Sequence, residues 1–152
     1  VMTVNEHQKT KMIERMKEHF KEGLKGKKIA VWGLSFKPQT DDIREAPSLL
    51  NIQELLTLGA SVHVHDPEAL ENVRKQMGDK INYHSNSYEA LKDANALLIA
   101  TEWPEYRTPD YEKMAQLMKT KAIFDGRNIY DLSNIRELGF IYYSIGRETI
   151  KN

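Results

Sequence analysis

The charged segment 33–48, GLSFKPQTDDIREAPS, follows the short apolar run KIAVW and holds the residues best suited to bind an anion. Lys37 could carry a full positive charge to a phosphate, and Pro38 would stiffen the backbone beside it. Pro47 fits the first turn of a following helix, whose unpaired N–H groups also favour an anion. The segment lacks the G-x-G-x-x-G pattern of the usual dinucleotide turn. Phosphate binding through side-chain charge is therefore one interpretation of Lys37, and a solvated surface lysine, the commoner case for a single lysine after a strand, is the other.

Two interpretations fit the charged residues that follow Lys37. In the first, Asp41 and Asp42 favour the positive end of the next helix, and Arg44 pairs with one of them. In the second, Arg44 projects toward a second phosphate and the aspartates hold it in place. Spacing alone does not distinguish a positioned arginine from a paired one, so both interpretations stay open.

Three further segments follow apolar runs and would lie at the same edge of a parallel sheet. Asp66 in HDP could bind a ribose hydroxyl, although we favour helix capping for an aspartate that precedes a proline. Arg127 in FDGRNIY could offer a two-pronged contact to a phosphate or sugar oxygen. Trp103 and Tyr106 in TEWPEYR could flank a base or cover the edge of the core.

Metal and thiol chemistry find little support in the sequence. The chain has no cysteine, which excludes disulfides, thiolate ligands and a cysteine nucleophile within it. His63 and His65 would point to one face of a strand and could grip a metal ion. Because spacing places no third ligand, we predict no metal site.

A parallel sheet would bring these residues together, and apolar runs alternate with helical patterns along the chain. The predicted strands are 28–33, 61–65, 80–84, 95–100, 121–125 and 140–145, and the predicted helices are 47–58, 67–77, 87–93 and 110–119, with a short irregular or helical piece at 131–138. Several strands are continuously apolar, as expected when helices cover both faces. The predicted fold is α/β, a doubly wound, mainly parallel, six-stranded Rossmann-like sheet.

An extra N-terminal helix is predicted over residues 5–22. Its apolar residues form a narrow stripe at helical spacing: Met12, Ile13, Met16 and Phe20. The stripe fits either a docking seam on another domain or subunit, or packing on the chain's own domain. Glycines at 23 and 26 separate this helix from the α/β region.

Composition narrows the functional class. The 152 residues suit one domain, and the 22 basic and 22 acidic side chains cancel. Nucleic acid and anionic membranes attract excess positive charge, so neither is a predicted partner. The longest apolar stretches are too short to span a bilayer, and the N-terminus lacks the apolar core of a signal peptide. We therefore expect a cytoplasmic location.

Taken together, three segments resemble one known family. KIAVWGLSFKPQTDDIREAPS, TEWPEYR and FDGRNIYDLSNIRELGFIYYSIGR are similar to the C-terminal, UDP-binding domain of the UDP-glucose 6-dehydrogenases, over residues 4–147. VNEHQK resembles the end of that family's central helical region. The resemblance therefore implies that residues 1–25 end a dimerisation or linker helix and that residues 26–152 form the UDP-sugar-binding domain. UDP-N-acetylmannosamine and GDP-mannose dehydrogenases share several of these elements and are the alternative.

The resemblance also implies roles for individual residues. Full-length members oxidise UDP-glucose to UDP-glucuronate in two NAD-dependent steps, through a thioester on a cysteine, and are built as homodimers. By resemblance, Phe36, Lys37 and Arg127 contact the UDP-sugar, Arg127 from its own or a neighbouring subunit, and Arg44 reaches NAD. The family binds NAD mainly through an N-terminal domain.

The sequence also departs from the family. It has no cysteine and no G-x-G-x-x-G, and Leu132 stands where a proline is expected. We therefore expect a fragment that holds no catalytic residue and is inactive alone. Two other classes remain as alternatives, a phospho-acceptor signalling module and a dimerisation fragment. The third predicted strand, however, ends in YHS rather than in the aspartate that a phospho-acceptor needs.

Overall fold

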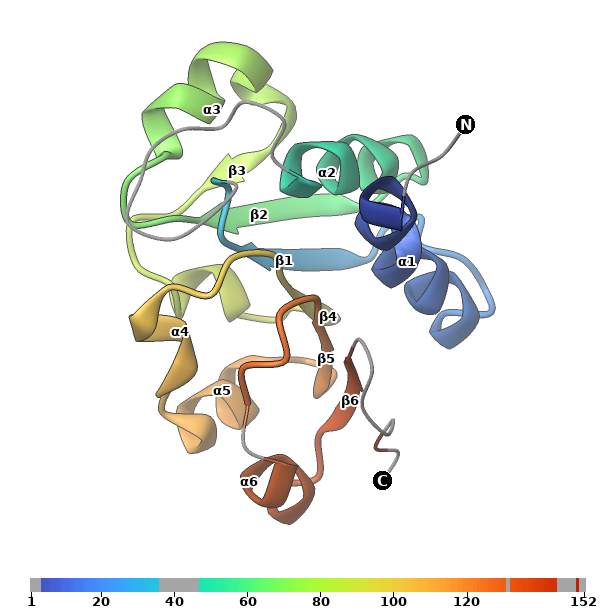
Figure 1. Cartoon of the computed structure of the whole chain (residues 1–152), viewed down its shortest axis with the longest axis vertical. Coiled ribbons are helices and arrows are strands. Elements are labelled where there is room, and N and C mark those ends of the chain that lie inside the picture. Colours follow the sequence, from blue (N-terminus) through green and yellow to red (C-terminus); the bar gives the residue numbers. More distant parts are fainter. Residues whose placement is uncertain (1–3, 36–46, 131, 145–149, 151–152) are drawn as a thin grey trace.

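The computed structural model describes residues 4–35, 47–130, 132–144 and 150, and for residues 4–11 and 47 it describes only the backbone. Six strands in this part of the chain form one parallel sheet in the order β3-β2-β1-β4-β5-β6 (Figure 1). They are β1 (Lys28–Trp32), β2 (Ser61–His65), β3 (Asn82–Tyr83), β4 (Ala96–Ile99), β5 (Ala122–Asp125) and β6 (Ile141–Ser144). The predicted α/β, doubly wound sheet is confirmed, and every pairing between these strands is parallel.

Helices cover both faces of the sheet. They are α1 (Val4–His19), α2 (Pro47–Thr57), α3 (Leu70–Met77), α4 (Pro104–Arg107), α5 (Tyr111–Leu117) and α6 (Leu132–Glu137), with 3₁₀ turns η1 (Gly78–Lys80) and η2 (Glu89–Leu91). In Figure 1, α1 and α2 lie on one side of the sheet and α4, α5 and α6 lie on the other. α2 begins at Pro47, as predicted from the lack of a proline N–H.

Two details of the helix prediction are wrong. The segment 87–93 forms only the three-residue turn η2, because Lys92 leaves the helical conformation with a ψ of 120° and Asp93 then takes a positive φ of 60°. The second detail is α4, which the prediction missed. Its four residues begin at Pro104 and are too few to show a helical period.

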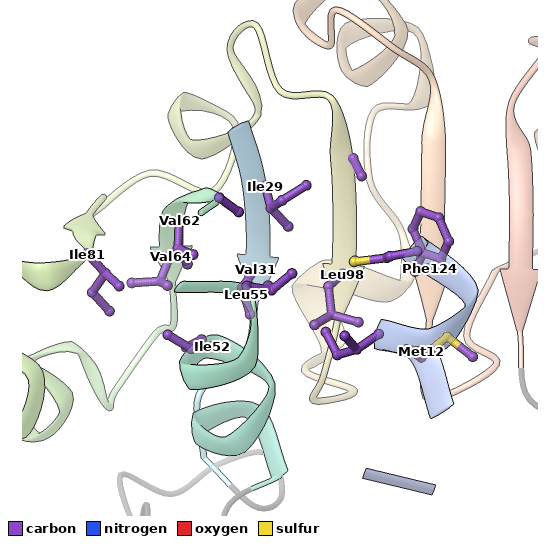
Figure 2. Packing of buried hydrophobic residues seen from close by; sticks show 14 of the residues in the cluster. Met12, Ile29, Val31, Ile52, Leu55, Val62, Val64, Ile81, Leu98 and Phe124 are labelled. Carbon is purple, nitrogen blue, oxygen red and sulfur yellow. The ribbon is translucent and has the colours of Figure 1, made fainter. Parts of the chain in front are cut away.

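Side chains of successive strand residues enter two separate cores. In β1, Ile29 and Val31 join the cluster beneath α1 and α2, whereas Ala30 and Trp32 join the cluster beneath η2 and α4–α6. Figure 2 shows the first cluster, with Ile52 and Leu55 of α2 facing strand residues. This two-sided burial explains the continuously apolar strands in the sequence.

The stripe on α1 packs on the chain's own sheet. Its four side chains are at most 6% exposed and share the first core cluster with Leu98 and Phe124: Met12, Ile13, Met16 and Phe20. Figure 2 shows Met12 on this face. The second of the two interpretations is therefore confirmed for these side chains. The division of the chain at residues 25 and 26 stays a prediction.

None of the described helices is long and apolar enough to cross a membrane. The cytoplasmic location stays a prediction.

Gly33 lets β1 pass close to the chain that leaves β4. Its φ is +100°, and a Cβ there would lie 2.5 Å from the Cβ of Thr101. Its N–H donates to the His65 carbonyl at 2.9 Å, which ties the end of β1 to β2. The position thus needs glycine both for its φ and for the space.

We expect Gly33→Ala to lower the free energy of unfolding by about 2–5 kcal/mol, because backbone strain and a clash with Thr101 add together. Urea unfolding measures this loss. Gly23→Ala is a matched control, since Gly23 has a φ of +99° and open space around a Cβ. It should cost only the backbone term, about 1–2 kcal/mol. Equal losses in the two variants would show that the close approach to Thr101 carries no energy.

Candidate functional site

The carboxyl edge of the sheet is the candidate site. From β1 the chain continues to β2 on one side of the sheet, and the other half begins at β4 on the opposite side, so the strand order reverses between β1 and β4. Ligands of doubly wound sheets bind at such a switch point. The segments 33–35, 100–102 and 126–128 follow β1, β4 and β5 and meet at this edge.

Hydrogen bonds fix the segment that follows β1. The buried Thr101 hydroxyl donates to the Ser35 carbonyl at 2.7 Å, and the Ser48 hydroxyl donates to the Leu34 carbonyl at 2.7 Å. Thr101 thus links the β1 turn to the end of β4, and Ser48 links it to α2. Both side chains serve to hold this edge together.

Asp66 organises two turns at once. One carboxylate oxygen accepts the N–H groups of Leu34 at 2.7 Å and Ser35 at 3.4 Å. The other accepts those of Glu68 and Ala69, both at 2.8 Å. Asp66 is only 2% exposed. The expected helix-capping role is wrong, because α3 begins only at Leu70 and its N-cap residue, Ala69, makes no side-chain capping bond. Asp66 instead fixes the turn before α3 and bonds to the β1 turn, a role that spacing could not predict.

Asp125 does the same for the turn after β5. Its Oδ1 accepts the N–H groups of Arg127 at 2.7 Å and Asn128 at 2.8 Å. Its Oδ2 accepts the Ile129 N–H at 2.8 Å and the Tyr142 hydroxyl at 2.6 Å. The residue is fully buried at the end of β5. Sequence reasoning missed this role, although an aspartate followed by glycine at a strand end was a usable signal.

Arg127 is the cation that this turn presents at the edge. Its Nε donates to the Ala100 carbonyl at 3.0 Å and lies 3.2 Å from Oε2 of Glu102. Its side chain is 32% exposed. A guanidinium carries five N–H donors in a planar fork, a geometry suited to the oxygens of a phosphate or a sugar.

Four buried polar atoms near this edge have no hydrogen-bond partner within the described residues. They are Oε2 of Glu102 and Nε1 of Trp103 from the chain after β4, Oδ1 of Asn128 from the turn after β5, and Oγ of Ser144 at the end of β6. Natural proteins leave few such groups unpaired unless water or a ligand completes them. Sequence reasoning did not single out Asn128 or Ser144, since lone polar residues carry no spacing signal.

The other predicted site residues either lie outside the described part of the chain or pack in the core. Phe36, Lys37 and Arg44, together with Asp41 and Asp42, lie outside the described residues. Tyr106 is fully buried, its ring stacks on Trp32 with centroids 4.9 Å apart, and its hydroxyl contacts the His65 ring at 2.8 Å. Burial raises the pKa of Tyr106 well above its usual value. Tyr106 therefore covers the core and does not flank a base, and Trp103 belongs to the same core cluster.

The histidines of β2 pair with protein groups. Nδ1 of His63 lies 2.8 Å from Nε2 of His84, and their rings stack with centroids 5.1 Å apart. Burial, Lys28 and His84 lower the pKa of His63 to about 4, and burial and Lys28 lower the pKa of His84. Among the described residues, no group of three or more potential ligands could hold a metal ion.

The strand order and the cation at the carboxyl edge define a Rossmann-like domain of the kind that binds nucleotides there. Comparison with known proteins narrows this class. Residues 30–132 match the family described as "UDP-glucose/GDP-mannose dehydrogenase family, UDP binding domain". The chain therefore belongs to the UDP-glucose/GDP-mannose dehydrogenase family and corresponds to its UDP-binding domain.

Individual relatives agree with this assignment. The chain is 41% identical over 148 residues to a UDP-glucose 6-dehydrogenase of Pseudomonas aeruginosa, covering 94% of this chain and 33% of that protein. It is 34% identical over 170 residues to UDP-glucose 6-dehydrogenase 1 of Arabidopsis thaliana, covering 97% and 35%. The structure of a UDP-glucose dehydrogenase from Pyrobaculum islandicum superposes with a TM-score of 0.77 at 35% identity, covering 92% and 30%. The chain thus spans about a third of the relatives it matches.

We expect Asp125→Asn to lower the free energy of unfolding by about 2–4 kcal/mol. The carboxylate of Asp125 accepts four hydrogen bonds, and in asparagine one of its two oxygens would be replaced by an NH₂ group, which cannot accept them. Thermal or urea unfolding measures the loss. Tyr142→Phe is the matched control, since it removes one donor and leaves the three backbone bonds, so its loss should be smaller. An Asp125→Asn variant as stable as the parent would contradict the role given to this carboxylate.

The His63–His84 pair predicts a loss of stability in acid. Because the folded pKa of His63 is about 4 and its usual value is 6.5, the unfolded chain takes up the proton first as the pH falls. The free energy of unfolding should therefore fall between about pH 6.5 and pH 4, by on the order of 1–2 kcal/mol after allowance for solvent screening. Unfolding curves across this range for the parent and for His63→Gln measure the difference. A parent and variant with the same pH dependence would contradict the prediction.

Proposed function

We propose that the chain is the nucleotide-sugar-binding domain of an NAD-dependent UDP-glucose 6-dehydrogenase, which oxidises UDP-glucose to UDP-glucuronate in two steps. In this proposal the domain binds the UDP part of the substrate and supplies none of the groups that form the covalent intermediate. The chain contains no cysteine, so a thioester would need a thiolate from elsewhere, and the chain alone would be inactive.

The observation that carries the proposal is the position of Arg127. Its guanidinium lies at the carboxyl edge, beside the switch point, in a domain whose family is defined by UDP binding. Arginine is suited to a diphosphate because its planar fork can donate two parallel hydrogen bonds. The unpaired polar atoms of Trp103, Asn128 and Ser144 near this edge offer further partners for a nucleotide sugar or its bound water.

Other residues complete the proposed site. Phe36 and Lys37 would contact the UDP-sugar together with Arg127, and Arg44 would reach NAD bound mainly by another part of the enzyme. The whole enzyme is proposed to be a homodimer. The support for these roles is the motif at 33–48, whose residues from 36 to 46 lie outside the described part of the chain.

UDP-glucose is favoured over the related sugars by the identities of the relatives. The Pyrobaculum islandicum UDP-glucose dehydrogenase is 35% identical. A UDP-D-ManNAc dehydrogenase from Pyrococcus horikoshii is 27% identical over a similar share of the chain. UDP-N-acetylmannosamine and GDP-mannose therefore remain the alternative substrates. The dimerisation-fragment alternative loses its motivation, because the α1 stripe is buried in the chain's own core.

Titration of the 152-residue chain with UDP tests the proposal, by calorimetry and by chemical-shift changes. We expect UDP to bind and GDP to bind more weakly. Lys37→Ala should weaken UDP binding by about 1.5–3 kcal/mol, because it removes a charge-assisted contact. Lys75→Ala, at an exposed position on α3, is the matched control and should leave UDP affinity unchanged.

Two results would count against the proposal. A folded sample that gives neither heat nor shift changes at saturating UDP would show that the domain does not bind UDP by itself. Equal affinities of the parent and Lys37→Ala would remove Lys37 from the site while leaving the rest of the proposal in place.

A further inference from the structure

Arg127 is held at two points that come from different loops. At its backbone, the N–H bonds to Asp125 at 2.7 Å. At its side chain, Nε donates to the Ala100 carbonyl at 3.0 Å, so the residue bridges the ends of β4 and β5. The neighbouring Gly126 N–H bonds to the Ile99 carbonyl at 3.0 Å and draws the two loops together.

Glu102 approaches the same nitrogen in a different way. Its Oε2 lies 3.2 Å from Nε of Arg127, yet this buried oxygen accepts no hydrogen bond from any described residue. The N–H of Nε points to the Ala100 carbonyl instead. A carboxylate oxygen that is shielded from water without a hydrogen bond is costly, and the charge of the guanidinium is what offsets that cost here.

The order of the Arg127 side chain affects what a ligand gains by binding it. An arginine side chain carries about 2 kcal/mol of rotamer entropy, and a ligand that orders it has to offset that entropy. The Ala100 carbonyl fixes the direction of one N–H, and the Glu102 charge holds the guanidinium against that carbonyl. The plane of the fork is therefore set before any ligand arrives.

We propose that Glu102 is a positioning residue that orders the Arg127 guanidinium for a nucleoside diphosphate at the carboxyl edge. The proposal rests on the proposed function, in which Arg127 contacts the UDP-sugar. Glu102 acts through Arg127 and does not itself touch the ligand. An acidic side chain at an anion site would by itself repel the anion, so its removal would strengthen binding. If Glu102 positions Arg127, its removal weakens binding instead, and the direction of the change in affinity tests the proposal.

The test is a double-mutant cycle on the 152-residue chain, with UDP affinity measured for the parent, Glu102→Gln, Arg127→Ala and the double variant. We expect Glu102→Gln to weaken UDP binding about 5- to 30-fold when Arg127 is present. It should change the affinity less than about twofold when Arg127 is absent, because nothing remains to be positioned. Glu112→Gln, at an exposed position on α5, should leave both values unchanged.

Several outcomes would overturn the proposal. Equal weakening by Glu102→Gln with and without Arg127 would mean that Glu102 acts independently, and unchanged binding would mean that it has no such role. Tighter binding would mean that the carboxylate competes with the ligand for Arg127. Unfolding curves for each variant separate these results from a loss of fold.

A second measurement does not depend on UDP. The Nε–H resonance of Arg127 should exchange with water faster in Glu102→Gln than in the parent, by about fivefold or more, as the guanidinium leaves the Ala100 carbonyl. An unchanged exchange rate would overturn the positioning role. If the parent binds no UDP but this exchange difference is present, the proposed function fails while Glu102 still orders Arg127, so the two failures can be told apart.

Discussion

The carboxyl edge of this sheet depends on two buried carboxylates that accept the N–H groups of the loops. Asp66 accepts four backbone N–H groups, and Asp125 accepts three together with the Tyr142 hydroxyl. Loop N–H groups that are buried away from water and have no hydrogen-bond acceptor destabilise the fold. A carboxylate can accept several of these N–H groups at once. Each aspartate stands next to the end of its strand and turns an irregular loop into a fixed one.

The two buried aspartates also affect the electrostatics of the site. Two carboxylates at the edge of the sheet give it negative charge, and a bound diphosphate would add more. Positive side chains are therefore needed at this edge to bind a diphosphate. Among the described residues, Arg127 is the positive side chain at the turn that Asp125 fixes. The proposed roles of Lys37 and Arg44 follow the same requirement.

Most of the fold could be predicted from the sequence because burial on both faces leaves continuous apolar runs, and these runs match the strands within a residue or two in most cases. The failures have local causes. η2 ends early because Lys92 leaves the helical conformation and Asp93 adopts a left-handed backbone, and α4 is one turn started by a proline. In the site, the cation Arg127 could be found from an aspartate and a glycine at a strand end. Its partner Glu102 could not, because their contact spans two loops and no spacing rule links them.

The glycine-poor turn after β1 now has an explanation in hydrogen bonding. In a glycine-rich dinucleotide turn, backbone N–H groups next to the strand face the pyrophosphate. Here the N–H groups of Leu34 and Ser35 are already bonded to Asp66, and the N–H of Gly33 is bonded to the His65 carbonyl. The single glycine serves the close approach to Thr101 instead of a phosphate. These three N–H groups are therefore not available to a phosphate at this edge, where a charged side chain such as Arg127 can bind it instead.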